Sequence, residues 1–219
     1  MTPSFETLRA AMIDSQLRPT GVNDVRVIEA FMPVRREAFV PQAARALAYL
    51  DAAVPIAPGR VLMEPMLFGN LVMRAELDPA DHVLLIGAAS GYEAAVLGRL
   101  VANVIAVESD PALAEAARAA LAVQGARNVR VVDAPLADGW LEDAPYDVLF
   151  LNGAAEELPP ALIDQLANNG RFVGVIRAQG GIAHATAGRK GNGTIGFASF
   201  MEAGGDLLPG FERPRGFRF

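Results

Sequence analysis

The amino-acid sequence predicts an α/β fold in which a mostly parallel sheet is covered by helices on both faces. Short apolar runs alternate with helical segments from residue 82 to residue 176, and this order is typical of parallel strands joined by crossover helices. Two β-rich segments near the C-terminus are separated by the sequence RKGNG, which predicts an antiparallel hairpin. Of the 219 residues, 52% are hydrophobic and 20% are charged, so apolar surface suffices for a large core.

The elements follow in order along the chain. Apolar residues at helical spacing predict helices over residues 5–17, 22–32 and 65–77. The parallel strands are expected at residues 82–86, 103–107, 129–132, 146–151 and 171–176, separated by helices at 93–100, 111–123 and 159–166. The hairpin is expected at residues 181–187 and 194–202, with residues 189–193 as its turn. We expect one domain, made of a helical lead (1–78), a sheet core (79–205) and a tail (206–219) that is either an ordered edge or a frayed end.

Composition argues against several classes of function. The net charge is -6 and no basic stripe is visible, so a nucleic-acid partner is not expected. The chain has no cysteine, which rules out a disulfide framework and a thiolate nucleophile, and no histidine and carboxylate cluster has metal-ligand spacing. No apolar stretch is long and uninterrupted enough to predict a membrane span. We expect a cytoplasmic protein of undetermined oligomeric state.

The end of the first parallel strand is the place where a ligand is expected. The loop Gly87, Ala88, Ala89, Ser90, Gly91 follows that strand, and its small residues let backbone approach a ligand, although a tight turn alone explains it equally well. Glu108 ends the next strand, 21 residues after Gly87, where a carboxylate can accept hydrogen bonds from ribose hydroxyls or can simply be solvated. Both a nicotinamide dinucleotide and S-adenosylmethionine fit this pattern. Ala89 in place of a middle glycine, together with the terminal hairpin, favours S-adenosylmethionine.

Longer segments resemble the protein-L-isoaspartate O-methyltransferase family. They are MIDSQLRPTGVNDVRVIEAFMPVRREAFVP (12–41), AYLDAAVPI (48–56), HVLLIGAASGYEAAVLGRL (82–100) and APYDVLFLNGAAEELPPALIDQL (144–166). The resemblance is collinear over roughly residues 10 to 176. It implies a Rossmann-like, seven-stranded sheet with an N-terminal helical extension, S-adenosylmethionine as cofactor, and methyl esters formed on carboxylates of isoaspartyl residues in proteins or peptides.

The resemblance also implies which residues form the site. The substrate positions are Met63, Glu64 and Pro65; the cofactor positions are Gly87, Ala88, Ala89, Ser90, Gly91, Glu108, Ser109, Asp133, Ala134, Pro135 and Asn152. A carboxylate acceptor is already ionised and the sulfonium is already activated, so no general base is needed and catalysis would come from positioning. His82 and His184 are accordingly expected to be structural or exposed.

Several positions depart from the family pattern. Met63 stands where the family has a serine that reaches the substrate carboxylate, and a thioether cannot donate a hydrogen bond. Leu85, Ala89 and Pro135 replace residues expected at the cofactor. Three hypotheses therefore remain: a methyltransferase acting on isoaspartyl residues, a methyltransferase with another acceptor, and a non-catalytic relative that acts as a binding module.

Overall fold

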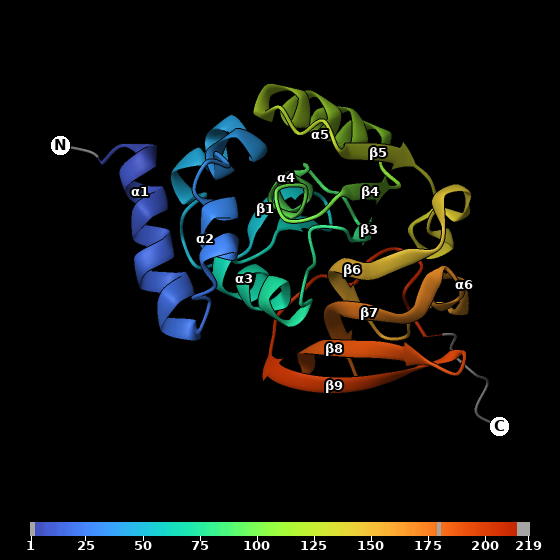
Figure 1. The fold of residues 1–219 in the computed structure, drawn as a ribbon. Helices are drawn as coiled ribbons and strands as arrows, with labels where there is room; N and C mark the ends of the chain where they lie inside the picture. Colours follow the sequence, from blue (N-terminus) through green and yellow to red (C-terminus); the bar gives the residue numbers. More distant parts are fainter. Residues whose placement is uncertain (1–2, 179–180, 214–219) are drawn as a thin grey trace.

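A central seven-stranded sheet organises the molecule, and helices cover both of its faces (Figure 1). The computed structural model describes residues 3–178 and 181–213. The strands are β3 (His82–Ile86), β4 (Asn103–Glu108), β5 (Val129–Asp133), β6 (Tyr146–Ala155), β7 (Leu166–Arg177), β8 (Ala183–Gly191) and β9 (Thr194–Glu202). Their spatial order is β5-β4-β3-β6-β7-β8-β9, with β8 and β9 antiparallel to their neighbours and the rest parallel. The predicted mostly parallel sheet with a closing hairpin is confirmed.

Strand order reverses between β3 and β6. From β3 the chain steps outward to β4 and β5, and then returns to the other side of β3 to place β6. Crossover connections therefore leave β3 in two directions, and a crevice forms beyond the carboxyl ends of β3 and its neighbours. The sheet thus positions the loop after Ile86 and the last residue of β4 at one edge.

Alternate strand residues belong to two separate apolar cores, one on each face of the sheet. Leu85, Ala106 and Phe150 lie in one apolar cluster, whereas Leu84, Val107 and Leu149 lie in the other. Helices α3 (Pro65–Arg74), α4 (Tyr92–Leu97) and α5 (Pro111–Gln124) contribute to the first cluster, and α6 (Pro160–Asp164) contributes to the second. Because both faces are covered there, the central strands β3, β4 and β6 are almost continuously buried and largely apolar, which is why they could be recognised in the sequence.

The N-terminal third packs as a helical layer beside the sheet, to the left of α3 and α4 in Figure 1. It contains α1 (Phe5–Met12), a π-helical turn (Ile13–Leu17), α2 (Val25–Phe31) and the 3₁₀ helices Arg18–Thr20, Arg36–Phe39 and Gln42–Leu47. The expected helix over 22–32 was too long at its start, because the Asp24 side chain caps α2 by accepting from the backbone N–H of Arg26 at 2.7 Å. None of the helices in the described ranges is long and apolar enough to cross a membrane.

A two-stranded ribbon was missing from the sequence prediction. Strands β1 (Val54–Ala57) and β2 (Arg60–Leu62) pair antiparallel next to α3, in a segment that was expected to hold helices. The turn between them contains Gly59 with φ +67°, a conformation that glycine adopts without strain. The ribbon is important for the site because it places Arg60 next to Glu108, the last residue of β4.

The hairpin turn is shorter than expected, and the described part of the tail takes the ordered one of its two expected forms. Strand β8 continues to Gly191, so the turn is the pair Asn192 and Gly193, both with positive φ, rather than the whole run 189–193. The tail, from residue 206 to at least residue 211, packs against the end of β6. The Ala154 N–H donates to the Asp206 carbonyl and the Leu208 N–H donates to the Ala154 carbonyl, each at 2.9 Å.

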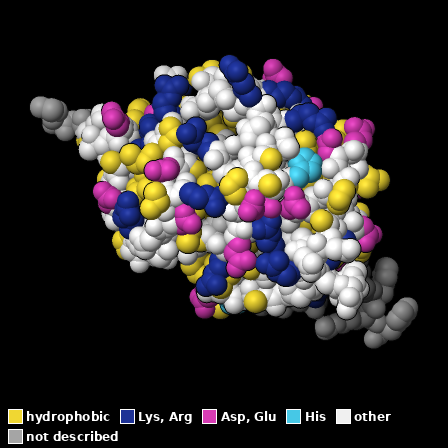
Figure 2. All heavy atoms as spheres, in the orientation of Figure 1, with side chains coloured by type: hydrophobic (Ala, Val, Ile, Leu, Met, Phe, Trp, Pro, Cys, Tyr) yellow, Lys and Arg dark blue, Asp and Glu magenta, His cyan; other side chains and the backbone are white. Residues whose placement is uncertain are grey.

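Charged side chains are distributed over the surface rather than sorted by sign. Figure 2 shows basic and acidic groups interspersed on the face in view, with apolar groups between them. Such a mixture gives no single-sign field over that face.

Candidate functional site

The loop after β3 is fastened by backbone hydrogen bonds to the end of β4. Gly87 and Ala88 both donate their N–H groups to the Val107 carbonyl, at 3.0 and 2.9 Å. Gly87, Ala89 and Gly91 all have positive φ, at 82°, 52° and 94°. A side chain on Gly91 would also come within 3.2 Å of the Ala117 Cβ, so glycine there allows α4 to pack against α5. The loop is therefore a fixed backbone platform at the strand order reversal.

Glu108 is the buried centre of this platform. Its side chain has no exposed surface, and both of its oxygens accept hydrogen bonds. One oxygen accepts from the backbone N–H groups of Ser109 (2.9 Å) and Asp110 (3.0 Å), and the other accepts from the Ala89 N–H (2.7 Å) and from Arg60. A carboxylate offers about four lone-pair positions, so all of them are occupied, three by backbone and one by a side chain.

Arg60 is the side chain that completes this set. It reaches Glu108 from β2 through Nη2 as a buried ion pair, and its own side chain is 8% exposed. The second terminal nitrogen, Nη1, is buried and has no hydrogen-bond partner within the described residues. A buried donor without a partner is costly, which marks Nη1 as a group with a remaining binding capacity.

A small cavity lies beside this ion pair. Its lining includes Arg60, Met63, Glu64, Ala89 and Asn152, together with Ala53, Gly59, Val61, Leu67, Gly153, Val175, Gly204, Gly205, Asp206 and Leu208. Its volume is about 80 Å³. The cavity thus joins the platform to the segment between β2 and α3.

The C-terminal segment forms one wall of the cavity. Leu208 is buried, and its side chain lies 3.4 Å from the position that a Cβ on Gly87 would take. A Cβ on Gly153, whose φ is 152°, would lie 2.7 Å from the same side chain. Glycine at position 153 therefore allows Leu208 to close over the end of β6.

The predicted cofactor residues converge on Glu108 and the loop. Ala89 and Asn152 line the cavity, and the Asn152 amide donates to the Gly87 carbonyl at 2.9 Å. The Ala134 N–H donates to the Glu108 carbonyl at 3.1 Å, which brings the end of β5 to the same place. Gly87, Ala88, Gly91 and Ser109 contribute through backbone, as described above, and the buried Ser90 hydroxyl has no partner within the described residues.

The remaining predicted residues lie at the margin of the site. The Asp133 side chain turns away to pair with Arg118 of α5, and Pro135 begins a 3₁₀ turn over Leu136–Asp138. On the other side, Met63 and Glu64 line the cavity, whereas Pro65 is buried as the first residue of α3. His82 contacts the Asp143 carbonyl at 3.1 Å and stacks on Tyr146 at the opposite end of β3. His184 lies in β8.

A buried polar group under the cavity was missed from the sequence. Arg36 has no exposed surface, donates from Nε to the Ala48 carbonyl at 2.6 Å, and donates from Nη2 to the Met63 carbonyl. Its guanidinium lies 4.7 Å from the ring centre of Tyr92. Glu93 is fully buried next to it; desolvation raises the pKa of Glu93, and the Arg36 charge opposes that shift. Arg36 therefore holds the backbone that presents Met63.

Arg36, Glu93 and Leu208 carry no local sequence signal for these contacts, whereas a weak signal precedes Arg60. The Pro58-Gly59 pair lies between two short apolar runs and indicates a β-turn, which would place Arg60 at the start of a strand. Its partner Glu108 lies 48 residues away, so the ion pair follows from the fold alone.

Comparison with known proteins identifies the family. The model of the protein-L-isoaspartate(D-aspartate) O-methyltransferase family, PCMT, matches residues 8–202. The chain belongs to this family. It is similar to the protein-L-isoaspartate O-methyltransferase of Koribacter versatilis (39% identical over 169 residues, 77% of this chain and 76% of that protein) and to that of Methylorubrum populi (40% over 177 residues, 80% and 82%). The resemblance noted in the sequence is thus confirmed.

Solved structures of the family share the fold. One protein-L-isoaspartate O-methyltransferase superposes with a TM-score of 0.83 at 24% identity, covering 94% of this chain and 66% of that one. A protein-L-isoaspartate O-methyltransferase structure from Plasmodium falciparum, in complex with S-adenosyl-L-homocysteine, gives a TM-score of 0.79 at 18% identity, covering 94% and 99%. The Rossmann-like, seven-stranded architecture with its N-terminal helical extension is confirmed.

Proposed function

We propose that this protein transfers a methyl group from S-adenosylmethionine to the carboxylate of isoaspartyl residues in proteins or peptides. Membership of the family supports this activity. The observation that carries the proposal is the placement of Glu108 and the Gly87-to-Gly91 loop at the strand order reversal, beside a cavity that reaches Met63 and Glu64. The cofactor half and the acceptor half of a transfer site are thus contiguous.

The residues around Glu108 suit the cofactor in kind. We propose that it is held by the set predicted from the sequence: Gly87, Ala88, Ala89, Ser90, Gly91, Glu108, Ser109, Asp133, Ala134, Pro135 and Asn152. This assignment is supported by a buried strand-end carboxylate, by small loop residues, and by a Ser90 hydroxyl that has no partner among the described residues. The cavity of about 80 Å³ is smaller than ligand sites of roughly 300–1,000 Å³. The cavity therefore has to widen when the cofactor binds, and Arg60 and Leu208 are two of the side chains that line it.

The chemistry asks the protein for position rather than proton transfer. When bound, S-adenosylmethionine supplies a methyl group that its sulfonium already activates, and the acceptor carboxylate is ionised at neutral pH. Met63 and Leu208 contribute apolar side chains to the cavity wall, which limit the access of water, while the fixed loop holds the reacting groups in position. We propose Met63, Glu64 and Pro65 as the segment on the acceptor side.

A different acceptor is the second candidate. Glu64 and Asp206 line the cavity together with buried Glu108 nearby, and several carboxylates would repel an anionic substrate. A positively charged or neutral acceptor would avoid that repulsion. A binding module without catalysis is the third candidate, favoured by the small cavity. The cytoplasmic location and the absence of a nucleic-acid partner stay predictions. The oligomeric state stays undetermined.

The decisive experiment is methyl transfer with matched peptides. The purified protein is incubated with methyl-labelled S-adenosylmethionine and either an isoaspartyl peptide or the same peptide with normal aspartate. We expect base-labile label on the isoaspartyl peptide alone. Cofactor binding without label on either peptide would favour another acceptor, and absence of cofactor binding would favour the binding module.

A further inference from the structure

The buried ion pair between Arg60 and Glu108 has the features of a contact that a ligand replaces. Three of the four hydrogen bonds to the Glu108 carboxylate come from backbone N–H groups of Ala89, Ser109 and Asp110. Those groups are fixed by the sheet and the loop. Arg60 supplies the fourth, and it is the one donor on a side chain that can rotate away. A hydroxyl can therefore bind Glu108 by displacing Arg60.

The position of Arg60 limits where a displaced guanidinium goes. It is the one basic residue in the lining of the cavity, as far as the described residues extend. Its Nη1 is already buried, and no residue in the described part of the chain hydrogen-bonds to it. It extends from the short β1–β2 ribbon, which pairs outside the seven-stranded sheet and is bordered by Gly59. Rotation away from Glu108 leaves the guanidinium in the cavity, on the side of Met63 and Glu64.

The negative charges in the cavity lining make Arg60 necessary for binding an anionic acceptor. Glu64 and Asp206 line the same space, so a substrate carboxylate enters an acidic environment. Met63 offers no hydrogen-bond donor at the place where the family has serine. A guanidinium supplies both missing properties, since it is positively charged and donates two parallel hydrogen bonds to a carboxylate.

We propose that Arg60 binds the carboxylate of the methyl acceptor, and that its ion pair with Glu108 withholds it until the cofactor occupies Glu108. This inference rests on the proposed function of the same site. It makes binding ordered: the cofactor ribose takes the fourth acceptor position on Glu108, and the released guanidinium then receives the acceptor. The two ligands consequently strengthen each other's binding by the same factor.

The test measures binding of each ligand by calorimetry, with the full chain and without turnover. The ligands are S-adenosylhomocysteine and an isoaspartyl peptide, each titrated alone and in the presence of the other. For the unmodified protein we expect S-adenosylhomocysteine to raise peptide affinity roughly tenfold. For Arg60→Gln we expect S-adenosylhomocysteine to bind roughly three- to tenfold more tightly, because its competitor for Glu108 is gone. Peptide affinity falls by roughly tenfold or more and no longer responds to S-adenosylhomocysteine.

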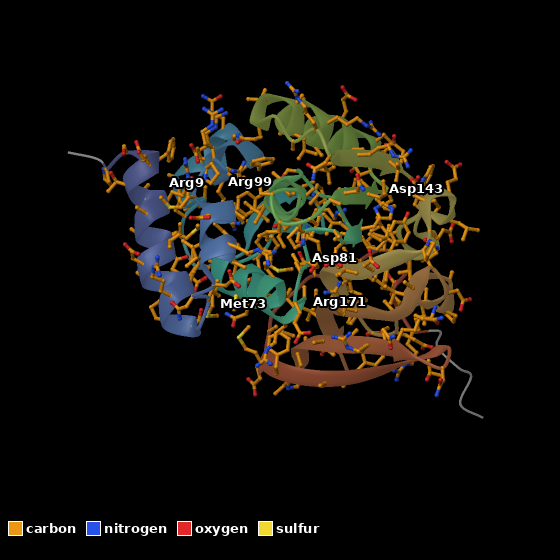
Figure 3. All side chains as sticks on the ribbon, in the orientation of Figure 1. Arg9, Met73, Asp81, Arg99, Asp143 and Arg171 are labelled. Atoms are coloured by element: carbon orange, nitrogen blue, oxygen red, sulfur yellow. The ribbon has the colours of Figure 1, made fainter. Side chains whose placement is uncertain are left out.

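Two further variants separate recognition from folding. Arg60→Lys keeps the charge but loses the paired donors, so the mutual strengthening persists while peptide binding weakens. Arg171→Gln removes an arginine from another partly buried ion pair, with Asp81 at the amino end of the strands (Figure 3), and leaves both affinities unchanged. Arg60→Gln that binds S-adenosylhomocysteine more weakly, or that keeps the full strengthening between ligands, would overturn the inference. Failure of the unmodified protein to methylate the peptide would instead overturn the proposed function, whereas the S-adenosylhomocysteine titration of Arg60→Gln is unaffected by that result.

Discussion

The two halves of the cavity are built in different ways. Around Glu108 the contacts come from main-chain groups of the loop and of the residues after β4. On the opposite side, Arg60, Met63 and Glu64 contribute side chains from the β1–β2 ribbon and the connection to α3. A main-chain site tolerates changes of side chain, whereas a side-chain site changes its chemistry with each substitution. A cofactor site of the proposed kind can therefore persist in this chain while the proposed acceptor side diverges.

The departures at Leu85 and Ala89 illustrate the point. Leu85 is fully buried in the apolar cluster shared with α3 and α4, so it acts as a core residue. Ala89 contributes its N–H to Glu108 and holds a positive φ of 52°. That conformation costs roughly 1–2 kcal/mol for a residue other than glycine, which the surrounding loop contacts offset.

Removal of the Glu108 carboxylate should have the largest effect. Glu108→Ala leaves Arg60 buried without its counter-charge, and breaking such a pair costs about 3–5 kcal/mol. We expect a fall of that size in the free energy of unfolding, measured by denaturant titration, together with loss of S-adenosylhomocysteine binding. Glu115→Ala is the comparison, because Glu115 lies outside the proposed site and its exposed pair with Arg118 in α5 contributes about 0–1 kcal/mol. Equal effects of the two substitutions would mean that Glu108 has no special role.

The contact between Gly153 and Leu208 should show the next largest effect. Gly153→Ala places a Cβ 2.7 Å from Leu208 and strains the backbone, which should cost about 1–3 kcal/mol. Leu208→Ala alone removes a buried side chain, at about 2–5 kcal/mol. Combined, they should cost less than the sum, because the clash disappears. Strictly additive free energies of unfolding would show that Leu208 does not pack on Gly153.

The buried Glu93 should produce a smaller effect that depends on pH. Burial raises its pKa in the folded protein, so the folded state holds this proton to higher pH than the unfolded state. Stability contributed by the protonated form is present below the unfolded pKa and is lost as pH rises through the folded pKa. The glutamine in Glu93→Gln does not titrate. As pH rises, the unmodified protein should therefore lose stability relative to this variant, by up to about 1.4 kcal/mol in the free energy of unfolding per pH unit. The measurement runs from about pH 4, near the ordinary pKa of glutamate, to about pH 8. If the two free energies of unfolding differ by the same amount over this whole range, the pKa of Glu93 is not raised.

Met63→Ser should change acceptor recognition least. If Arg60 receives the acceptor carboxylate, a restored hydroxyl adds little, and the KM for an isoaspartyl peptide should fall by less than roughly threefold. The variant should be compared at a temperature where circular dichroism shows it fully folded, since a buried side chain is lost. A much larger fall in KM would assign the missing recognition to the hydroxyl and not to Arg60.

The sheet could be predicted because its strands carry their own signal. Residues 83–86 and 104–107 are apolar runs bounded by polar or turn residues, and both faces of the sheet are buried at these strands. The β1–β2 ribbon escaped prediction because its strands have four and three residues and one contains Pro55. The loop and Glu108 were predicted from spacing alone. Arg60 and Leu208 were not, because their partners lie far along the chain and are brought near by the strand order.

The most direct test of this account is calorimetric titration of the purified protein with S-adenosylhomocysteine. We expect micromolar binding to one site per chain, and loss of this binding in Glu108→Ala. Absence of binding by a folded, unmodified protein would contradict it, because the backbone platform around Glu108 would then not be a cofactor site.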